Sequence, residues 1–378
     1  MTSKKNNISK FNTCYGCGVC VIACPVKIID YKLNNEGFYV PVIHEMDKCI
    51  NCGICLDICA YNHTEIASPP IMENVRAWGC RSRNSENRKL STTGAMGYEI
   101  AIEAIKRHNK VCSVRYDLEN NRAEHYIATN ISELNTSRGT KYIPSFTITG
   151  FNAIGKNDLF TIFGLPCQID SLRRYIRRFK LEDKIRLIDL FCYGVPSLLL
   201  WHRYIKETTK DIGHINNVIF RSKKNGWHHS SCIEIDGSNQ TYISKKKDDP
   251  FFGLFFRDCA LNSCCYNKCK YKLCSSSADV RIGDFWGEKY ATDEEGVNVL
   301  FSLTAKGNEI VEELQSTCEF EEVSILEATA KQKHHNAKLS PFRSFVIWGL
   351  NHKIPLAVLN RVVKYGRILI NPKRLIKN

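Results

Sequence analysis

The alternation of apolar and polar positions divides the chain into a short N-terminal part and a longer part of mixed character. Residues 28–43 (IIDYKLNNEGFYVPVI) predict a strand, a turn at Asn-Asn-Glu-Gly and a second strand. From Trp78 onward the pattern changes. Residues 94–108 have the apolar periodicity of a helix, and residues 111–117 are a strand candidate.

Strands followed by tight turns and helices recur in the middle of the chain. Residues 158–179 predict a strand, a turn at GLPCQ (164–168) and a helix. Residues 185–197 predict a buried strand that ends in a Gly-Pro turn, and a helix follows to about Thr209. This alternation favours an α/β domain with a mainly parallel sheet, in which ligands bind at the carboxyl ends of the strands.

Another strand candidate, residues 278–290, runs into Gly-Asp-Phe-Trp-Gly. An acidic residue, two aromatic residues and flanking glycines can pack against a planar ring, and a hairpin with a buried Trp is the alternative. The preceding segment is rich in cysteine and could bind a further cluster or zinc, or form a structural loop with free thiols. Its cysteines are Cys259, Cys264, Cys265, Cys269 and Cys274.

Eight cysteines near the N-terminus form two copies of one motif. Residues 14–25 have the spacing C-x2-C-x2-C-x3-C-P, and residues 49–59 repeat it with Ala60 in place of the proline. Three thiolates two residues apart can bind three corners of one cubane, whereas the fourth cysteine ligates the other cluster. Zinc sites usually combine two short C-x2-C motifs that are separated by a longer loop. Two [4Fe–4S] clusters therefore fit the observed spacing better than two zinc ions. The first takes Cys14, Cys17, Cys20 and Cys59, and the second takes Cys49, Cys52, Cys55 and Cys24.

Composition supports metal sites rather than disulfides. The 19 cysteines are odd in number and repeat their spacing. The start of the sequence has no apolar core of a signal peptide, and no run of 18 apolar residues occurs. We therefore expect a cytoplasmic protein in which the thiols stay reduced.

Positive charge is concentrated at the end of the chain. The formal net charge is +14, and the 11 Lys and Arg residues from Lys331 onward account for all but +3 of it. No Asp or Glu follows Glu327, and Leu356, Leu359 and Val363 have helical spacing. Residues 331–378 therefore predict a basic amphipathic tail that covers the core, contacts an anionic membrane at its inner face, or docks an acidic redox protein. No nucleic-acid-binding module accompanies the charge, so we expect no nucleic acid partner.

Several motifs together resemble one family. Together with the two cysteine motifs, they are similar to those of the coenzyme F420 hydrogenase/dehydrogenase beta-subunit family. The motifs follow the family's order from about residue 10 to residue 315. Within the family, the chain resembles the bacterial type that is associated with polysaccharide biosynthesis. The resemblance implies FAD between the middle and C-terminal portions, and electron exchange among clusters, flavin and a second redox partner. The motifs are GTKYI (139–143), GLPCQIDSLRRY (164–175), LIDLFCYGVPS (187–197), FRSKKNGW (220–227), CYNKCKYK (265–272) and DVRIGDFWG (279–287).

The resemblance implies a domain organisation. Residues 1–70 form a bacterial two-cluster ferredoxin domain, and a mixed α/β flavin-binding domain follows. Its N-terminal part spans residues 75–212 and its C-terminal part spans residues 213–330. The basic tail lies outside the match.

The resemblance also implies the flavin-site residues, although four positions depart from the family pattern. Thr92 and Thr93 stand where Gly-Gly is usual, Leu165 replaces a Thr, and Tyr193 replaces a His. The implied cofactor-binding residues are Ser91, Thr93, Gly94, Gly164, Pro166, Gln168, Cys192, Gly194, Gly283, Asp284, Phe285 and Trp286.

Two residues are candidates for catalysis. Tyr193 could donate a proton as the family His would, more weakly at neutral pH because its ordinary pKa is about 10. Cys167 begins the predicted helix after the turn, and a helix N-terminus is expected to lower its pKa. It could be a thiolate that touches the flavin, a cluster ligand with Cys192, or a buried structural thiol. His228 and His229 are expected to be surface or packing residues.

These observations favour an iron–sulfur flavoprotein oxidoreductase that acts on a small organic substrate, such as a sugar intermediate of surface polysaccharide synthesis. Clusters carry single electrons, whereas a flavin exchanges electrons singly or as hydride. The expected redox partner is a ferredoxin, a flavodoxin or another reductase. The first alternative is an electron-transfer subunit without a substrate of its own, and the second is a zinc-stabilised binding protein.

Overall fold

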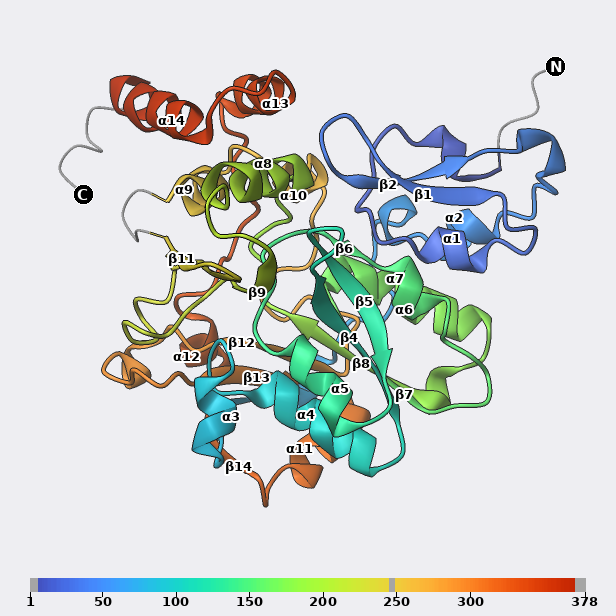
Figure 1. The fold of residues 1–378 in the computed structure, drawn as a ribbon. Helices are drawn as coiled ribbons and strands as arrows, with labels where there is room; N and C mark the ends of the chain where they lie inside the picture. The colour runs from blue at the N-terminus through green and yellow to red at the C-terminus, as the bar shows by residue number, and fades with distance from the viewer. Residues whose placement is uncertain (1–5, 245–248, 371–378) are drawn as a thin grey trace.

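The N-terminal lobe, which comprises residues 6–70, contains a two-stranded antiparallel hairpin (Figure 1). The computed structural model describes residues 6–244 and 249–370 of the chain. Strand β1 (Ile29–Leu33) pairs with β2 (Tyr39–Ile43), and Gly37 in the turn between them has a φ of +79°. This confirms the strand, turn and strand predicted from the sequence.

Two short helices pack together beside this hairpin. Helix α1 (Val19–Ala23) and helix α2 (Ile54–Asp57) each begin directly after a glycine in the left-handed region. These residues, Gly18 and Gly53, have φ angles of +74° and +72°, which glycine adopts without a steric penalty. The two halves of the cysteine repeat therefore have the same local structure.

A nine-stranded sheet forms the body of the protein. Its four inner strands, β12, β8, β7 and β4, run parallel, whereas the pairs β14–β3, β3–β13, β13–β12 and β4–β5 are antiparallel. The expectation of a mainly parallel sheet is therefore wrong, because β12 and β13 are joined without a helical crossover. In sheet order the strands are β14 (Cys318–Val323), β3 (Arg76–Ser82), β13 (Asn298–Ser302), β12 (Val280–Asp284), β8 (Ile185–Leu190), β7 (Phe160–Gly164), β4 (Lys110–Asp117), β5 (Arg122–Ala128) and β6 (Ser145–Phe146).

Strands from both predicted parts of the flavin-binding region contribute to this one sheet. Strands β3 to β8 precede residue 213 and β12 to β14 follow it, and β3 lies between β13 and β14. Residues 75–330 are thus joined by a continuous hydrogen-bonded layer.

Helices cover both faces of the sheet. Helix α4 (Met96–Lys106) and helix α11 (Ala305–Glu313) bury apolar residues such as Ile100 and Ile310 in one cluster. Helix α7 (Pro166–Arg178) packs between β8 and the N-terminal lobe, where its Leu172 shares a core with Val19 of α1. Helix α7 therefore connects the lobe to the sheet.

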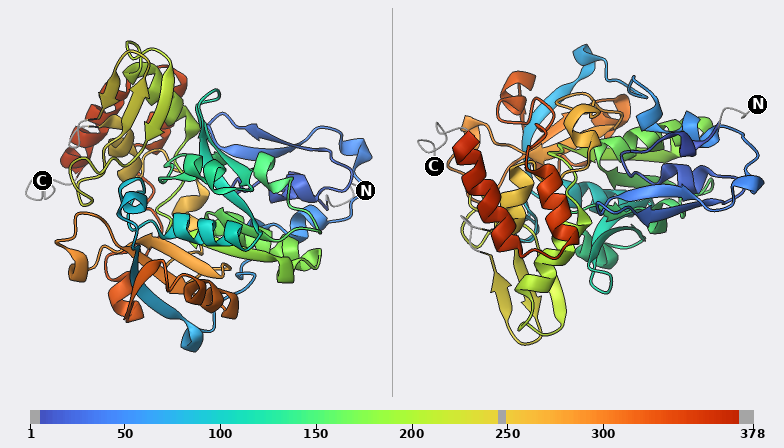
Figure 2. Two further views of the ribbon diagram at one scale, coloured as in Figure 1. Left: turned by 60° about the horizontal axis from the view of Figure 1, so that its bottom comes forward. Right: turned by 90° about the horizontal axis from the view of Figure 1, so that it is seen from above.

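A third group of elements lies beside the sheet (Figure 2). A small antiparallel sheet packs with helices into a core rich in aromatic residues. The final helix contributes Leu356, Leu359 and Val363, all fully buried, which confirms the helical spacing predicted for the tail. The elements are α8 (Leu198–Thr208), β9 (Ile215–Ile219), β10 (Glu234–Gly237), β11 (Thr241–Ile243), α9 (Pro250–Phe256), α13 (Arg343–Asn351) and α14 (Leu356–Ile370).

The remaining helices are short. None of the described helices has the length and apolarity needed to cross a membrane. They are α3 (Ser85–Lys89), α5 (Ile131–Leu134), α6 (Ile148–Phe151), α10 (Cys264–Asn267) and α12 (Ile325–Thr329).

Candidate functional site

The structure brings the cysteines of the N-terminal repeat together across its two halves. Burial is the main cause that raises the pKa of Cys20, and its thiol neighbours Cys17 and Cys59 raise it further. In the other set, burial raises the pKa of Cys55, with contributions from Cys52 and Cys24. The thiols thus form two sets, each with one cysteine from the opposite half: Cys14, Cys17, Cys20 and Cys59; and Cys24, Cys49, Cys52 and Cys55.

The second set surrounds a cavity. All four of its cysteines line a small pocket of about 20 Å³. The side-chain amide of Asn7 lies 3.4 Å from Cys49 Sγ and donates a hydrogen bond to it. Nowhere in residues 6–244 and 249–370 do three or more His, Cys, Asp or Glu side chains gather as ligands of a single metal ion. In a [4Fe–4S] cluster each cysteine binds a different iron, so such convergence on one ion is not required.

A third set of four cysteines lies between the N-terminal lobe and the sheet. Burial raises the pKa of Cys167 well above its ordinary value, and the largest charge contribution comes from Cys192, followed by Cys17, Cys265 and Cys269. Cys269 also lies close enough to Cys192 and Cys265 to raise the pKa of both thiols. The third set is Cys167, Cys192, Cys265 and Cys269.

Backbone pairing brings the segments of the third set together. Pro196 and Leu261 form an isolated antiparallel bridge. The N–H of Val195 donates to Cys265 Sγ over 3.5 Å. The ammonium group of Lys272 donates to the carbonyl of Cys192 over 3.1 Å.

The structure corrects the expectation for Cys167. It is the second residue of α7, as predicted, but its pKa is raised rather than lowered. Burial among other thiols disfavours the thiolate more than the helix N-terminus favours it. Cys167 also does not line the large cavity described below.

The other cysteines of residues 259–274 lie outside this set. The thiol of Cys259 donates to the carbonyl of Arg257 over 3.3 Å and lies 3.2 Å from Ser340 Oγ. Cys264 is an electrostatic neighbour of Cys14 in the N-terminal lobe. Cys274 is buried near Arg281.

The three sets follow one another toward the sheet. The Tyr15 hydroxyl donates to the carbonyl of Lys268, and the Asn262 amide donates to the carbonyl of Cys14 over 3.3 Å. Cys17 of the first set is an electrostatic neighbour of Cys167 of the third. Together these contacts dock residues 259–274 against the first set.

A cavity of about 640 Å³ lies beside the third set. Its wall includes Cys192 and the carboxyl ends of β7, β8 and β12, at Gly164, Leu190 and Asp284. This is the position expected for a ligand in an α/β sheet. The volume lies within the range of cofactor and small-molecule sites.

Most residues implied for the flavin site line this cavity, but four do not. Phe285 is fully buried and packs edge-to-face on Tyr290, with ring centroids 4.9 Å apart. Cys167, Pro166 and Gly94 also lie outside the wall. Those in the wall are Ser91, Thr93, Gly164, Gln168, Cys192, Tyr193, Gly194, Gly283, Asp284 and Trp286.

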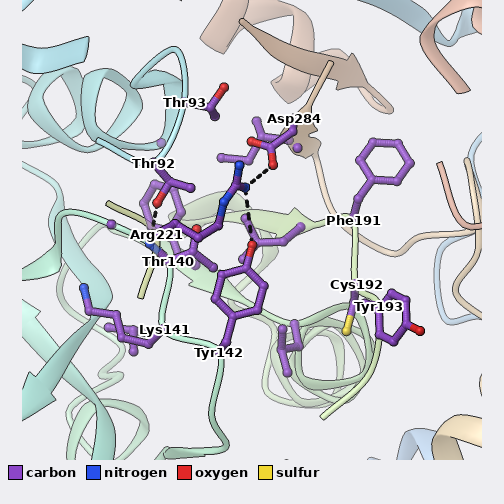
Figure 3. A pocket seen from close by; sticks show the side chains of 18 of the residues that line it. Thr92, Thr93, Thr140, Lys141, Tyr142, Phe191, Cys192, Tyr193, Arg221 and Asp284 are labelled. Carbon is purple, nitrogen blue, oxygen red and sulfur yellow. Dashed lines mark hydrogen bonds and ion pairs between the residues drawn. The ribbon is translucent and has the colours of Figure 1, made fainter. Parts of the chain in front are cut away.

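Tyr193 lines the cavity, but its hydroxyl is directed elsewhere. The hydroxyl donates to Asp258 Oδ1 over 2.8 Å, and in Figure 3 it points away from Arg221. Burial and the charge of Asp258 raise the pKa of Tyr193. A role as proton donor stays a prediction.

A buried arginine at the centre of the site was not identified as a site residue from the sequence. Arg221 contacts the carboxylate of Asp284 and lies 3.4 Å from the Tyr142 hydroxyl (Figure 3). It also donates to Ser230 Oγ over 2.6 Å. Its guanidinium lies 5.3 Å from the ring centroid of Trp286. Both Arg221 and Tyr142 fall within motifs of the family resemblance, and these motifs could have identified them as site residues.

His125 on β5 was also missed, and no motif marks it. It is 1% exposed, and its Nε2 donates to the carbonyl of Phe163 over 3.1 Å. Because the carbonyl can only accept, Nδ1 carries no proton, and burial lowers the pKa of His125 to about 4. Within the described part of the chain, Nδ1 has no hydrogen-bond partner. His125 therefore offers an unused acceptor in the cavity wall.

Other unpartnered polar atoms lie in the same wall. Ser91 Oγ, Arg138 Nη1 and Lys333 Nζ are buried and have no hydrogen-bond partner among the residues that the structure describes. Buried polar groups are nearly always satisfied in native proteins. The cavity wall thus offers unsatisfied hydrogen-bonding groups to a polar ligand.

The sequence matches two family models. Residues 158–327 match the model for the C-terminal part of the beta subunit of coenzyme F420 hydrogenase/dehydrogenase, and residues 13–66 match the 4Fe–4S dicluster domain. No curated protein matches the chain. A chain in a xenon-derivatised structure of the F420-reducing [NiFe] hydrogenase complex from Methanosarcina barkeri is similar, with 14% identity and a TM-score of 0.45, over 80% of this chain and 94% of that chain.

Proposed function

Because the chain belongs to the coenzyme F420 hydrogenase/dehydrogenase beta-subunit family and carries a 4Fe–4S dicluster domain, we propose that it is an iron–sulfur flavoprotein oxidoreductase. It passes electrons between iron–sulfur clusters, FAD and a small organic substrate. The observation that carries this proposal is the series of three thiol sets, which ends at Cys192 in the cavity wall.

The first two sets would each hold one [4Fe–4S] cluster, with the pairing given above. The third set would hold a further cluster, with one cysteine from α7, one from the loop after β8 and two from residues 264–269. A third cluster would place an electron carrier between the N-terminal lobe and the cavity.

The cavity residues suit a flavin dinucleotide. Ser91 and Arg138 offer unused donors near the N-terminus of α4, where a helix dipole favours phosphate. His125 Nδ1 would accept a hydrogen bond from a ligand N–H or O–H group. A bound flavin supplies exchange of one or two electrons, which the clusters alone do not.

The test is the cofactor content of protein purified without oxygen. We expect about twelve irons per chain, four for each cluster, and one FAD released by acid. The variant Cys269→Ala should then hold about eight irons, whereas Cys318→Ala, outside all three sets, should match the wild type. About eight irons in both the wild type and Cys269→Ala would show that the third set binds no cluster. Absence of flavin from the wild type would remove FAD from the proposal.

A second candidate function is an electron-transfer subunit that feeds a separate catalytic partner. The second thiol set supports it, because Cys52 is exposed and the neighbouring Ile50 is 61% exposed. An exposed apolar side chain beside a cluster suits docking of a redox protein such as a ferredoxin or flavodoxin. Turnover of candidate sugar substrates by the isolated protein would favour the oxidoreductase, and a stable complex without turnover would favour the subunit.

The tail offers a contact for an anionic membrane surface. On α14 the outward residues Val358, Val362 and Tyr365 are 47%, 41% and 58% exposed and share one helix face. Arg361 adds positive charge to this surface, and Trp348 on α13 is also exposed. Peripheral binding at the inner face of the membrane is therefore part of the proposal. Sedimentation with phosphatidylglycerol vesicles should fall in Val362→Glu, and equal sedimentation of both proteins would contradict it.

A further inference from the structure

The wall of the cavity carries a strong excess of positive charge. Among the described residues that line it, six are Lys or Arg and one is acidic, a formal balance of +5. They are Arg138, Lys141, Arg221, Lys272, Lys331, Lys333 and Asp284.

Two of these cations already have their donors engaged. Arg221 is paired with Asp284. Lys141 donates to the carbonyls of Ser137 and Arg138 over 2.8 and 2.9 Å, and burial lowers its pKa to about 7. Lys141 cannot bind a ligand without losing these partners, and the charge of Arg221 is balanced by that of Asp284.

Lys331 is paired with Glu288 over 4.0 Å, and the other three cations lie at two ends of the cavity. Arg138 is hydrogen-bonded to Asn87 and stacks on Tyr98 of α4, at the end assigned to the flavin phosphates. Lys272 and Lys333 belong to the other end, where Lys272 contacts Cys192 and Lys333 covers Tyr193. In Figure 3 Arg221 separates Thr92 and Thr93 from Cys192 and Tyr193.

Lys333 is poorly compensated at this second end. Its Nζ is buried, lies 3.4 Å from the centroid of the Tyr193 ring, and has Asp258 Oδ1 at 3.5 Å. The same carboxylate oxygen accepts the Tyr193 hydroxyl. Lys272 is a positive neighbour of Lys333, so the Lys333 ammonium group has a second cation nearby as well as the shared carboxylate.

We infer that Lys272 and Lys333 bind an anionic group, a phosphate or a carboxylate, of the organic substrate beside Cys192. Buried charge is costly unless it is paired, and lysine binds phosphate as a point charge. The inference rests on the proposed function, because it names the substrate class of the same cavity. A neutral sugar would add no negative charge to that of Asp258, so the sugar substrate that this inference predicts carries phosphate or an acid group.

The same lysines could instead face the phosphates of the flavin, and the experiment separates these cases. Calorimetric titration of oxygen-free holoprotein with inorganic phosphate, and separately with malonate, measures anion binding at constant ionic strength. We expect saturable binding of one anion in the wild type. Lys333→Met should raise the Kd for the anion at least about tenfold, because one charged contact is lost. The FAD content should stay constant.

Lys338→Met is the matched control, because Lys338 is exposed and lies outside the cavity wall. Lys272→Met provides a second variant if Lys333→Met does not fold. Tighter binding of phosphate or of malonate identifies the anion class. Absence of saturable binding, or equal Kd values in the wild type and both lysine variants, would overturn the inference.

Loss of FAD from Lys333→Met, restored by added FAD, would also overturn it, because the lysine would then hold the cofactor. A wild-type protein without flavin would contradict the FAD part of the proposed function instead. The phosphate titration of that protein and its Lys333→Met variant would still decide the inference.

Discussion

The hydroxyl oxygen of Ser171 on α7 lies 3.3 Å from the Sγ atom of Cys17 in the N-terminal lobe. The same oxygen accepts the N–H of Ala60 over 3.1 Å, next to Cys59. Ser171 follows Cys167 by one helical turn, so α7 contributes to the third thiol set and contacts the first. One rigid helix thus fixes the spacing between two sets.

Ser171→Ala should lower the reduction potential of the first cluster. When Cys17 is a cluster ligand, the hydroxyl can donate to its sulfur, and hydrogen bonds to sulfur raise the potential. A hydrogen bond worth about 1 kcal/mol corresponds to about 40 mV for one electron. A redox titration followed by electron paramagnetic resonance measures the shift. Ser132→Ala, on α5, is the control, and an unchanged potential in Ser171→Ala would show that the hydroxyl does not donate to sulfur.

His125→Phe should weaken binding of the proposed FAD by up to about tenfold, because the substitution removes the Nδ1 acceptor. His125→Asn keeps an acceptor and should restore part of the affinity. Fluorescence of free flavin at equilibrium gives both Kd values. Equal affinity in the wild type and His125→Phe would mean that Nδ1 does not contact the flavin.

The buried His125 should also make stability depend on pH. Its pKa is about 4 in the folded protein against about 6.5 in the unfolded chain, so between these values the unfolded chain binds more protons. The contribution is fully present above about pH 6.5 and is lost as the pH falls toward 4, in total about 3 kcal/mol. Urea unfolding at pH 7 and pH 5.5 should show a smaller pH dependence in His125→Phe than in the wild type. The same dependence in both proteins would contradict this.

Local spacing was sufficient to predict the first two thiol sets as groups. Ligands two or three residues apart are constrained by one loop, and the repeat itself indicates the exchange of Cys24 and Cys59. The hairpin over residues 28–43 and the strand, turn and helix over residues 158–179 also follow from local patterns.

The third set could not be derived in this way, because its members come from three separate segments. Only the fold brings Cys167 and Cys192 next to Cys265, through the bridge between Pro196 and Leu261. His125 carries no sequence signal either, since its role depends on a carbonyl of β7 that occupies its other nitrogen. Tertiary contacts, rather than periodicity, determine this part of the site.

Asp189→Asn should destabilise the protein by about 3–5 kcal/mol, because it leaves a fully buried arginine without a counterion. Arg281 donates to both carboxylate oxygens of Asp189 over 2.7 and 2.6 Å, and both side chains have no exposed surface. Arg281 also donates to the carbonyl of Leu273, which ties residues 259–274 to β12. Chemical denaturation should therefore show a lower midpoint, and the iron content should fall by that of the cluster proposed for the third set. Glu322→Gln, which breaks the exposed pair with Arg76, is the control and should change stability by less than about 1 kcal/mol. Equal midpoints for Asp189→Asn and Glu322→Gln would show that the buried pair does not stabilise the fold.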